Sequence, residues 1–133
     1  MGGHGALVTA LRNPNRWHSL SAFAPICNPS QVPWGQKAFT NYLGDDQFHW
    51  QDWDASMLLA QSAYPGLILV DQGLDDEFLQ RELHPDSLEK AALLSGQNLN
   101  LRRHSGYDHG YYFIQSFIED HLRHHAQQLQ LAA

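Results

Sequence analysis

The spacing of apolar and polar positions along the chain predicts helices that alternate with short strands. After a glycine-rich start, apolar residues recur at helical spacing over residues 6–11, and the helix should end before Pro14, because proline disfavours a helical residue ahead of it. Residues 17–24 form a short apolar stretch that ends at Pro25, and we expect a buried strand there.

The rest of the chain repeats this alternation. We expect polar and aromatic residues 45–53 to form a loop, and the unbroken apolar run 67–71 to form a strand buried on both faces. Residues 99–104 should form the last strand. Four further helices are expected. The first covers residues 34–43 and ends at Gly44, and the second begins after Asp54 as its cap and ends before Pro65-Gly66. The third covers residues 85–94 and ends before Gly96, and the last is a long helix that begins near Gly110.

The final helix carries an apolar stripe at i, i+3, i+4 and i+7 spacing that we expect to face the core. Its members are Ile114, Phe117, Ile118, His121, Leu122, His125 and Leu129. Helices alternating with strands in this way imply βαβ units and a parallel sheet. The pattern therefore predicts an α/β fold.

Size and composition narrow the class further. The 133 residues fit one domain, and 43% hydrophobic residues argue against disorder. The net charge of -6 offers no basic surface for nucleic acid, and no apolar run is long enough for a membrane span. The single cysteine, Cys27, cannot form an internal disulfide, which suits the reducing cytoplasm.

The first residues, Met1-Gly2-Gly3, have the composition of a tight turn that leads into a helix. Glycines let a chain turn sharply and pack closely against a sheet. A nucleophile elbow, G-x-S-x-G, is a strained turn of this kind that carries a serine between a strand and a helix. If Met1 follows the serine and Gly2 is the closing glycine, the nucleophile lies just upstream of this chain.

A histidine after the last predicted strand is the best candidate for proton transfer. His109 lies between Gly106 and Gly110, in a loop that can reach a site at the carboxyl edge of the sheet. An imidazole there can take a proton from a serine and return it to a leaving group. The alternative is a surface or helix-capping histidine without a catalytic role.

The acid that would orient this imidazole should lie in the loop after a strand. Asp71, Asp75 and Asp76 all compete. Asp71 ends the predicted strand and has little freedom to turn toward His109, whereas Asp75 and Asp76 are equivalent by composition. One of that pair should cap the helix that follows.

Serine site, then acid, then histidine is the chain order of α/β-hydrolases. The stretches Ser19–Pro29, Leu67–Asp76 and Gly106–Phe113 closely resemble the S-formylglutathione hydrolases, also called esterase D, and the resemblance extends from Met1 to about residue 126. It implies the C-terminal half of an α/β-hydrolase fold, a mainly parallel sheet flanked by helices. Residues 1–133 would then be a partial domain without its N-terminal half and nucleophile.

The resemblance also assigns roles to residues. It implies that Asp76, the second aspartate of the pair ahead of Phe78-Leu79, is the triad acid, that His109 is the base, and that the backbone N–H of Met1 is one donor of the oxyanion hole. The chain departs from the family at Gly110, where the family often has serine; we expect this to alter the helix start more than the chemistry.

In function, the resemblance implies a cytoplasmic homodimer that needs no cofactor and hydrolyses S-formylglutathione to glutathione and formate, a step in formaldehyde catabolism. A general carboxylesterase of short acyl esters would use the same residues. The alternative from another class is an inactive truncated or split fragment, which the missing serine favours for this chain alone.

Other reactive side chains give weaker signals. Two imidazoles at i and i+4 in the group His121, His124 and His125 have a spacing that could bind a metal, but a third ligand has no obvious place. Cys27 has no basic neighbour in sequence to activate it. No elbow surrounds the three serines near these stretches, Ser19, Ser21 and Ser105.

Overall fold

The computed structural model describes residues 1–132. A sheet of three parallel strands in the order β1-β2-β3 forms its centre, with Leu20 of β1 opposite Ile68 of β2, and Ile68 opposite Leu99 of β3. The strands are β1 (Leu20–Phe23), β2 (Ile68–Gly73) and β3 (Leu99–His104). The predicted parallel α/β architecture is confirmed, with β3 at its expected bounds and β1 shorter than residues 17–24.

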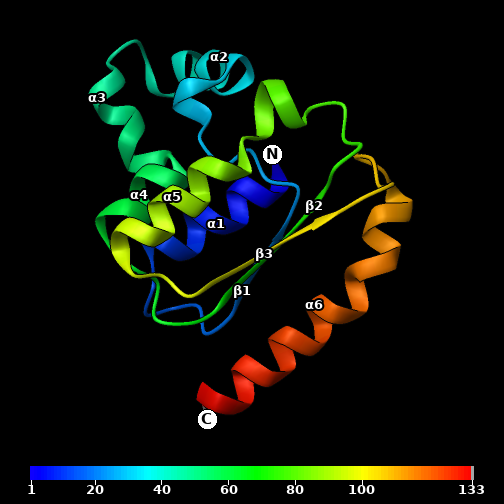
Figure 1. Cartoon of the computed structure of the whole chain (residues 1–133). Helices are drawn as coiled ribbons and strands as arrows, with labels where there is room; N and C mark the ends of the chain where they lie inside the picture. The colour runs from blue at the N-terminus through cyan, green and yellow to red at the C-terminus, as the bar shows by residue number, and fades with distance from the viewer. Residues whose placement is uncertain (133) are drawn as a thin grey trace.

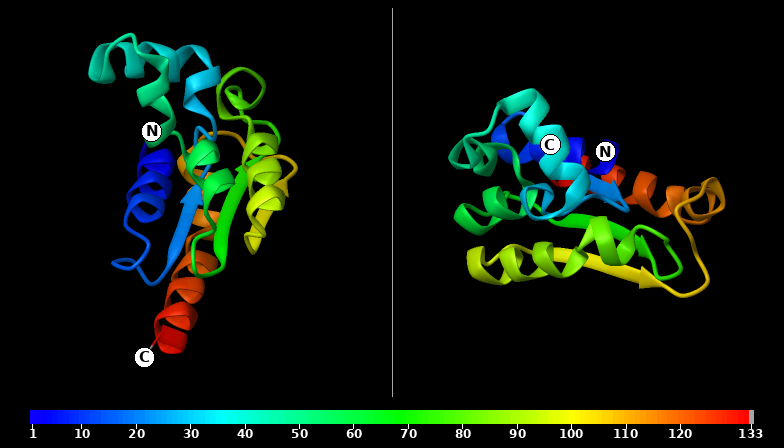
Figure 2. Two further views of the ribbon diagram at one scale, coloured as in Figure 1. Left: turned by 90° about the vertical axis from the view of Figure 1, so that its left-hand side faces the viewer. Right: turned by 90° about the horizontal axis from the view of Figure 1, so that it is seen from above.

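Helices cover both faces of this sheet. Three helices lie against one face and α6 crosses the other, where it contacts β1 and β2 (Figures 1 and 2). The helices are α1 (Gly2–Arg12), α2 (Pro33–Leu43), α3 (Gln47–Trp50), α4 (Ala55–Gln61), α5 (Pro85–Ser95) and α6 (Tyr111–Ala132), with shorter turns η1 (Pro29–Gln31), η2 (Gln51–Trp53) and the π-helical η3 (Leu79–Leu83). The three helices against the first face are α1, α4 and α5.

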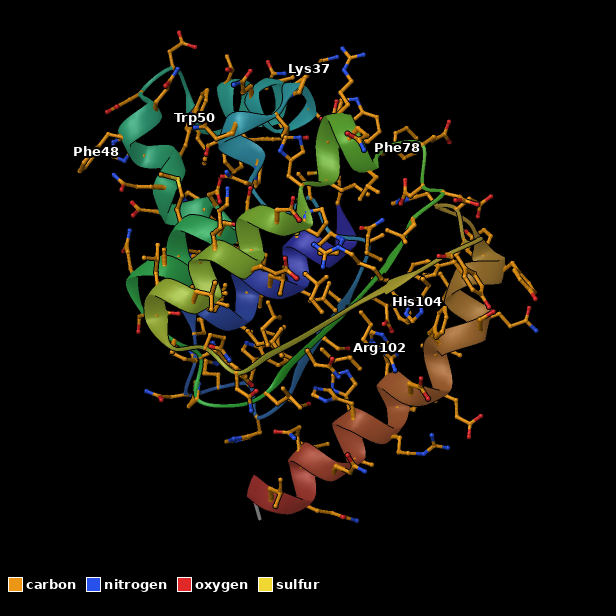
Figure 3. All side chains as sticks on the ribbon, viewed as in Figure 1. Lys37, Phe48, Trp50, Phe78, Arg102 and His104 are labelled. Carbon is orange, nitrogen blue, oxygen red and sulfur yellow. The ribbon has the colours of Figure 1, made fainter. Side chains whose placement is uncertain are left out.

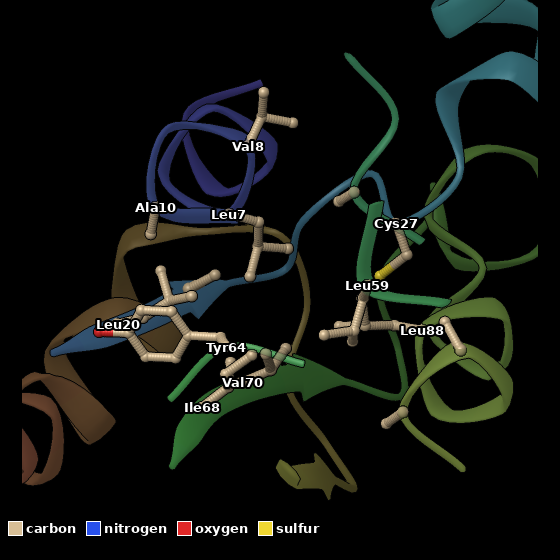
Figure 4. Close-up of a cluster of buried hydrophobic side chains, with 14 residues drawn as sticks. Leu7, Val8, Ala10, Leu20, Cys27, Leu59, Tyr64, Ile68, Val70 and Leu88 are labelled. Atoms are coloured by element: carbon tan, nitrogen blue, oxygen red, sulfur yellow. The ribbon is translucent and has the colours of Figure 1, made fainter. Parts of the chain in front are cut away.

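The main core lies between β1, β2 and these three helices (Figure 4). Leu7 of α1, Leu59 of α4 and Leu88 of α5 are fully buried there. All six residues of β2 are buried, as the unbroken apolar run predicts for a central parallel strand. β2 is therefore buried along its whole length and hydrogen-bonded to a strand on each side.

The expected loop over residues 45–53 is wrong, because the segment forms α3 and η2. Asp46 caps α3 by accepting a hydrogen bond from the Phe48 amide, and the Trp50 indole is buried and donates to the Gly44 carbonyl. A side-chain cap and one aromatic anchor stabilise a helix too short to show apolar periodicity.

The expected inward stripe of α6 is also wrong in part. Ile118, Leu122 and Leu129 are exposed, whereas Phe113 and His124 are buried. Polar groups of the sheet explain why α6 turns a different face inward than the apolar spacing predicts. His124 donates to the Leu20 carbonyl, and His121 binds Asp71 and Ser21 of the sheet. The face of α6 that contacts the sheet is therefore partly polar.

Candidate active site

The loops that follow β2 and β3 meet at the carboxyl edge of the sheet. The amide of Leu74 donates to the His104 carbonyl, and the amide of Asp75 donates to the Tyr107 carbonyl at 2.9 Å. Gly73 lies directly against the second loop, where a side chain would collide with the Tyr107 carbonyl oxygen. This close backbone approach brings residues 33 positions apart to the same place.

Asp76 and His109 form a hydrogen-bonded pair at this edge. Nδ1 of His109 donates to Oδ2 of Asp76 at 2.7 Å. The aspartate side chain is fully buried, and the imidazole is 39% exposed. Because a carboxylate can only accept, the proton lies on Nδ1, and Nε2 of the neutral ring has a free lone pair.

The Asp76 carboxylate has two further donors. Oδ1 accepts from the Phe78 amide at 2.9 Å, and Oδ2 also accepts from Nε2 of Gln72 at 3.1 Å. The bond to Phe78 closes a local turn ahead of η3. The N-cap position of η3 is Phe78 and no side chain caps it, so the expectation that Asp75 or Asp76 caps the following helix is wrong. Asp75 is exposed and its side chain lies outside this pair.

Aromatic side chains fix the position of the imidazole. The ring of Phe78 packs edge-on against His109 at a centroid distance of 5.3 Å, and Trp34 of α2 packs on Phe78 at 4.7 Å. Phe78 and Lys37 lie at the end of the molecule where α2 and η3 meet (Figure 3). Met1 shares a hollow with Trp34 and Lys37, so the chain start lies on the same side as the pair.

A hollow of about 340 Å³ opens beside His109. Its walls are mostly apolar and include Phe23, Ala24 and Phe113. Ala24 has a φ of 42°, a conformation that is uncommon for residues other than glycine and that concentrates at functional sites. The hollow can hold a small apolar group within reach of the imidazole.

Asp71 lies on the face of β2 that α6 covers, where it binds His121 and not His109. Its side chain is fully buried and accepts from Nε and Nη2 of Arg102 at 2.7 Å each, and from Nε2 of both His104 and His121 at 2.8 Å. Burial opposes its ionisation, but the hydrogen bonds from His121, Arg102 and His104 hold the pKa of the Asp71 carboxyl well below its usual range. Arg102 and His104 are visible between the sheet and α6 (Figure 3).

The histidines of α6 extend this network along β1. Nδ1 of His121 accepts from the Ser21 hydroxyl at 2.8 Å, the Ser21 oxygen accepts from Nε2 of His125 at 2.9 Å, and Nδ1 of His125 accepts from Ser19 at 2.7 Å. Burial lowers the pKa of both His124 and His125. These side chains hold α6 on the sheet, a role that the sequence pattern did not indicate.

Cys27 lies in the main core. Burial raises the pKa of its thiol, and the nearby Asp54 carboxyl raises it further. The thiol is therefore held in its neutral form, which is a poor nucleophile.

Comparison with known proteins matches this geometry to one family. The model of the family named Esterase matches residues 1–124. The chain belongs to the esterase family. An S-formylglutathione hydrolase from Arabidopsis thaliana is 52% identical over 132 residues, which are 98% of this chain and 46% of that protein. The chain thus spans about half the length of the curated relative it matches.

Solved structures agree with this assignment. An S-formylglutathione hydrolase from Agrobacterium tumefaciens has a TM-score of 0.92 and 46% identity, over 96% of this chain and 46% of that one. Dipeptidyl peptidase 4 from Porphyromonas gingivalis has a TM-score of 0.63 at 13% identity, over 97% of this chain and 18% of that one, and shares the fold alone. The predicted family and fold class, the C-terminal part of an α/β-hydrolase, are therefore confirmed.

Proposed function

We propose that this chain supplies the acid, Asp76, and the base, His109, of a serine hydrolase that cleaves S-formylglutathione to glutathione and formate. The observation that carries the proposal is the bond from Nδ1 of His109 to the buried carboxylate of Asp76. It leaves Nε2 without a hydrogen-bond partner among residues 1–132, and His109 itself lines an apolar hollow. The names of the two S-formylglutathione hydrolases supply the substrate class.

The chemistry follows from the tautomer of the imidazole. Nε2 takes the proton of a serine hydroxyl while the serine oxygen attacks the formyl carbonyl, and Asp76 stabilises the imidazolium that forms. The C–S bond then breaks, and Nε2–H protonates the departing thiolate. Water attacks the formyl-serine by the same route and releases formate.

The serine and one oxyanion donor must come from outside the described residues. Among residues 1–132, no serine hydroxyl hydrogen-bonds to His109. We propose that the serine precedes Met1 in the intact enzyme, so that the Met1 amide donates to the developing oxyanion. Residues 1–133 would then be a partial α/β-hydrolase domain that is inactive on its own.

The setting of the intact enzyme is part of the proposal. We infer a cytoplasmic homodimer without a cofactor that acts in formaldehyde catabolism and binds neither nucleic acid nor membrane. None of the helices in residues 1–132 combines the length and hydropathy of a membrane-spanning segment. A carboxylesterase of short acyl esters remains the second candidate, supported by the small apolar hollow beside His109.

The test is a joined enzyme, in which this chain follows the N-terminal remainder of the Arabidopsis S-formylglutathione hydrolase. We expect it to hydrolyse S-formylglutathione, and His109→Gln to abolish turnover. His49→Gln, which changes a histidine exposed on α3, is the matched control and should leave turnover unchanged. A joined enzyme that folds without esterase activity would contradict the proposal, and faster turnover of a short aryl ester would favour the carboxylesterase.

A further inference from the structure

Gln72 is a polar side chain on an otherwise apolar face of β2. Residues of a strand alternate between its faces, so Gln72 shares the face of Ile68 and Val70, which belong to the main core. Only 1% of its surface is exposed. Its Nε2 donates to Oδ2 of Asp76 at 3.1 Å and to the Gly73 carbonyl at 3.0 Å.

The orientation of this amide is fixed by its neighbours. Turned over, the amide would place its oxygen against the Asp76 carboxylate and the Gly73 carbonyl, which are both acceptors. In the observed orientation Oε1 is buried without a hydrogen-bond partner among residues 1–132. An unpaired buried acceptor is unfavourable. The same orientation places the amide nitrogen of Gln72 within hydrogen-bond distance of Oδ2 of Asp76.

Two donors therefore hold the two oxygens of one carboxylate. The Phe78 amide binds Oδ1 and the Gln72 amide binds Oδ2. A single donor would leave Oδ2 free to rotate away from the imidazole, because the terminal torsion of an aspartate is soft. With both donors present, the plane of the carboxylate is set and Oδ2 faces Nδ1 of His109.

We propose that Gln72 is a positioning residue for the acid–base pair. Its amide keeps Oδ2 of Asp76 directed at Nδ1 of His109, and so holds the neutral imidazole in the tautomer whose Nε2 can accept a proton. The effect on the tautomer depends only on this chain, whereas the effect on turnover rests on the proposed function. The competing account is a purely structural role, in which the amide only supports the turn at Gly73.

The variant that separates these accounts is Gln72→Met, which keeps the length of the side chain and removes the amide. Gln97→Met is the matched control, because Gln97 is also buried and donates to the Gly66 and Asn98 carbonyls at the opposite end of β2. Both variants lose side-chain bonds to the backbone. Only Gln72→Met loses a bond to Asp76.

The readout is the pair of ring ¹⁵N shifts of His109 in the 133-residue chain, which reports the position of the proton. In Gln72→Met the population of the Nε2–H tautomer should rise about tenfold, since a hydrogen bond to a charged group changes an equilibrium by about that factor or more. Gln97→Met should leave the population unchanged. An unchanged population in Gln72→Met, or an equal change in both variants, would overturn the proposal.

A second measurement does not depend on the folding of Gln72→Met. In the unmodified chain, one Nε2 proton of Gln72 should resonate downfield and lose that shift in Asp76→Asn, while the Nε2 protons of Gln97 stay in place. Gln72 protons that do not respond to Asp76→Asn would overturn the proposal as well. In an active joined enzyme, Gln72→Met should lower kcat about tenfold with KM unchanged, and an inactive joined enzyme would contradict the proposed function while leaving the tautomer test valid.

Discussion

Gly73 is the position where a single added methyl group should disrupt the candidate site without touching its polar side chains. It is the last residue of β2, and its backbone has an ordinary φ, so Gly73→Ala is not strained by conformation. A Cβ at this position would lie 2.3 Å from the Tyr107 carbonyl oxygen and 3.1 Å from the Asp108 oxygen. Both neighbours are backbone atoms that cannot rotate away.

The size of the effect follows from these distances. Ordinary van der Waals contact for a Cβ begins at 3.4 Å, so the two loops must separate by about 1 Å. That movement stretches the bond from Asp75 to the Tyr107 carbonyl and carries Asp76 away from His109. A misplacement of about 1 Å costs roughly 100-fold in rate, and overpacking costs about 1–3 kcal/mol of stability.

The assay is kcat of the joined enzyme together with the free energy of unfolding of the 133-residue chain. Gly5→Ala is the control, because nothing lies within 4 Å of a Cβ at this helical position and the change should stabilise α1 by about 0.5–1 kcal/mol. If Gly73→Ala kept both turnover and stability near those of the unmodified protein, the close approach of the two loops would not be what sets the geometry of the pair.

Two further predictions concern stability. Burial lowers the pKa of His4 to about 4, helped by the charge of the N-terminus, and its Nε2 accepts from the Ala55 amide. The stabilisation from neutral His4 is therefore complete at pH values above its unfolded pKa of about 6.5 and is lost as the pH falls to about 4, a change of about 3 kcal/mol in the free energy of unfolding. His4→Gln should flatten the dependence of the free energy of unfolding on pH in this range. An unaltered dependence would refute the lowered pKa of His4. Asp71→Asn should lower the free energy of unfolding, measured in denaturant, by about 3–5 kcal/mol, because Arg102 loses its buried partner. The control is Asp120→Asn, at a more exposed partner of Arg102, which should cost under about 1 kcal/mol. Equal losses in the two variants would contradict the role of Asp71 as the buried partner of Arg102.

The fold was predictable where local signals agree with burial. Gly44 and Gly96 have positive φ at the C-terminal ends of α2 and α5, and Asp54 caps α4 through the Met57 amide, as expected. The strand 99–104 was predicted at its observed bounds. At the three helix ends a residue with one strong local preference stands at the boundary, whereas the strand follows from the alternation of Leu99 and Leu101 with polar residues.

The errors arose where tertiary contacts override the local pattern. The face of α6 was assigned from apolar spacing, but polar partners on the sheet draw His121 and His124 inward and leave Leu122 exposed. The π-helical η3 was not predicted, because a wider helical turn has no distinct spacing in a five-residue segment. Such features depend on partners distant in sequence.

The candidate site divides in the same way. The positions after β2 and β3 follow from sequence order and parallel topology, but the residues alone left Asp75 and Asp76 equivalent, and only the family resemblance chose between them. Gln72 gave no signal, because its role depends on a carboxylate that the loop returns beside it. The assignment of Asp76 as the acid stays a prediction.

The central claim is that Asp76, and not Asp75, orients His109 for proton transfer. The direct measurement is kcat of the joined enzyme with Asp76→Asn against Asp75→Asn. Asp76→Asn should lower kcat by about 10⁴-fold, because asparagine favours the wrong imidazole tautomer. Asp75→Asn changes an exposed side chain outside the pair and should lower kcat less than about tenfold, because surface substitutions usually change stability by no more than about 0.5 kcal/mol. A severe loss in Asp75→Asn with a mild one in Asp76→Asn would contradict the account.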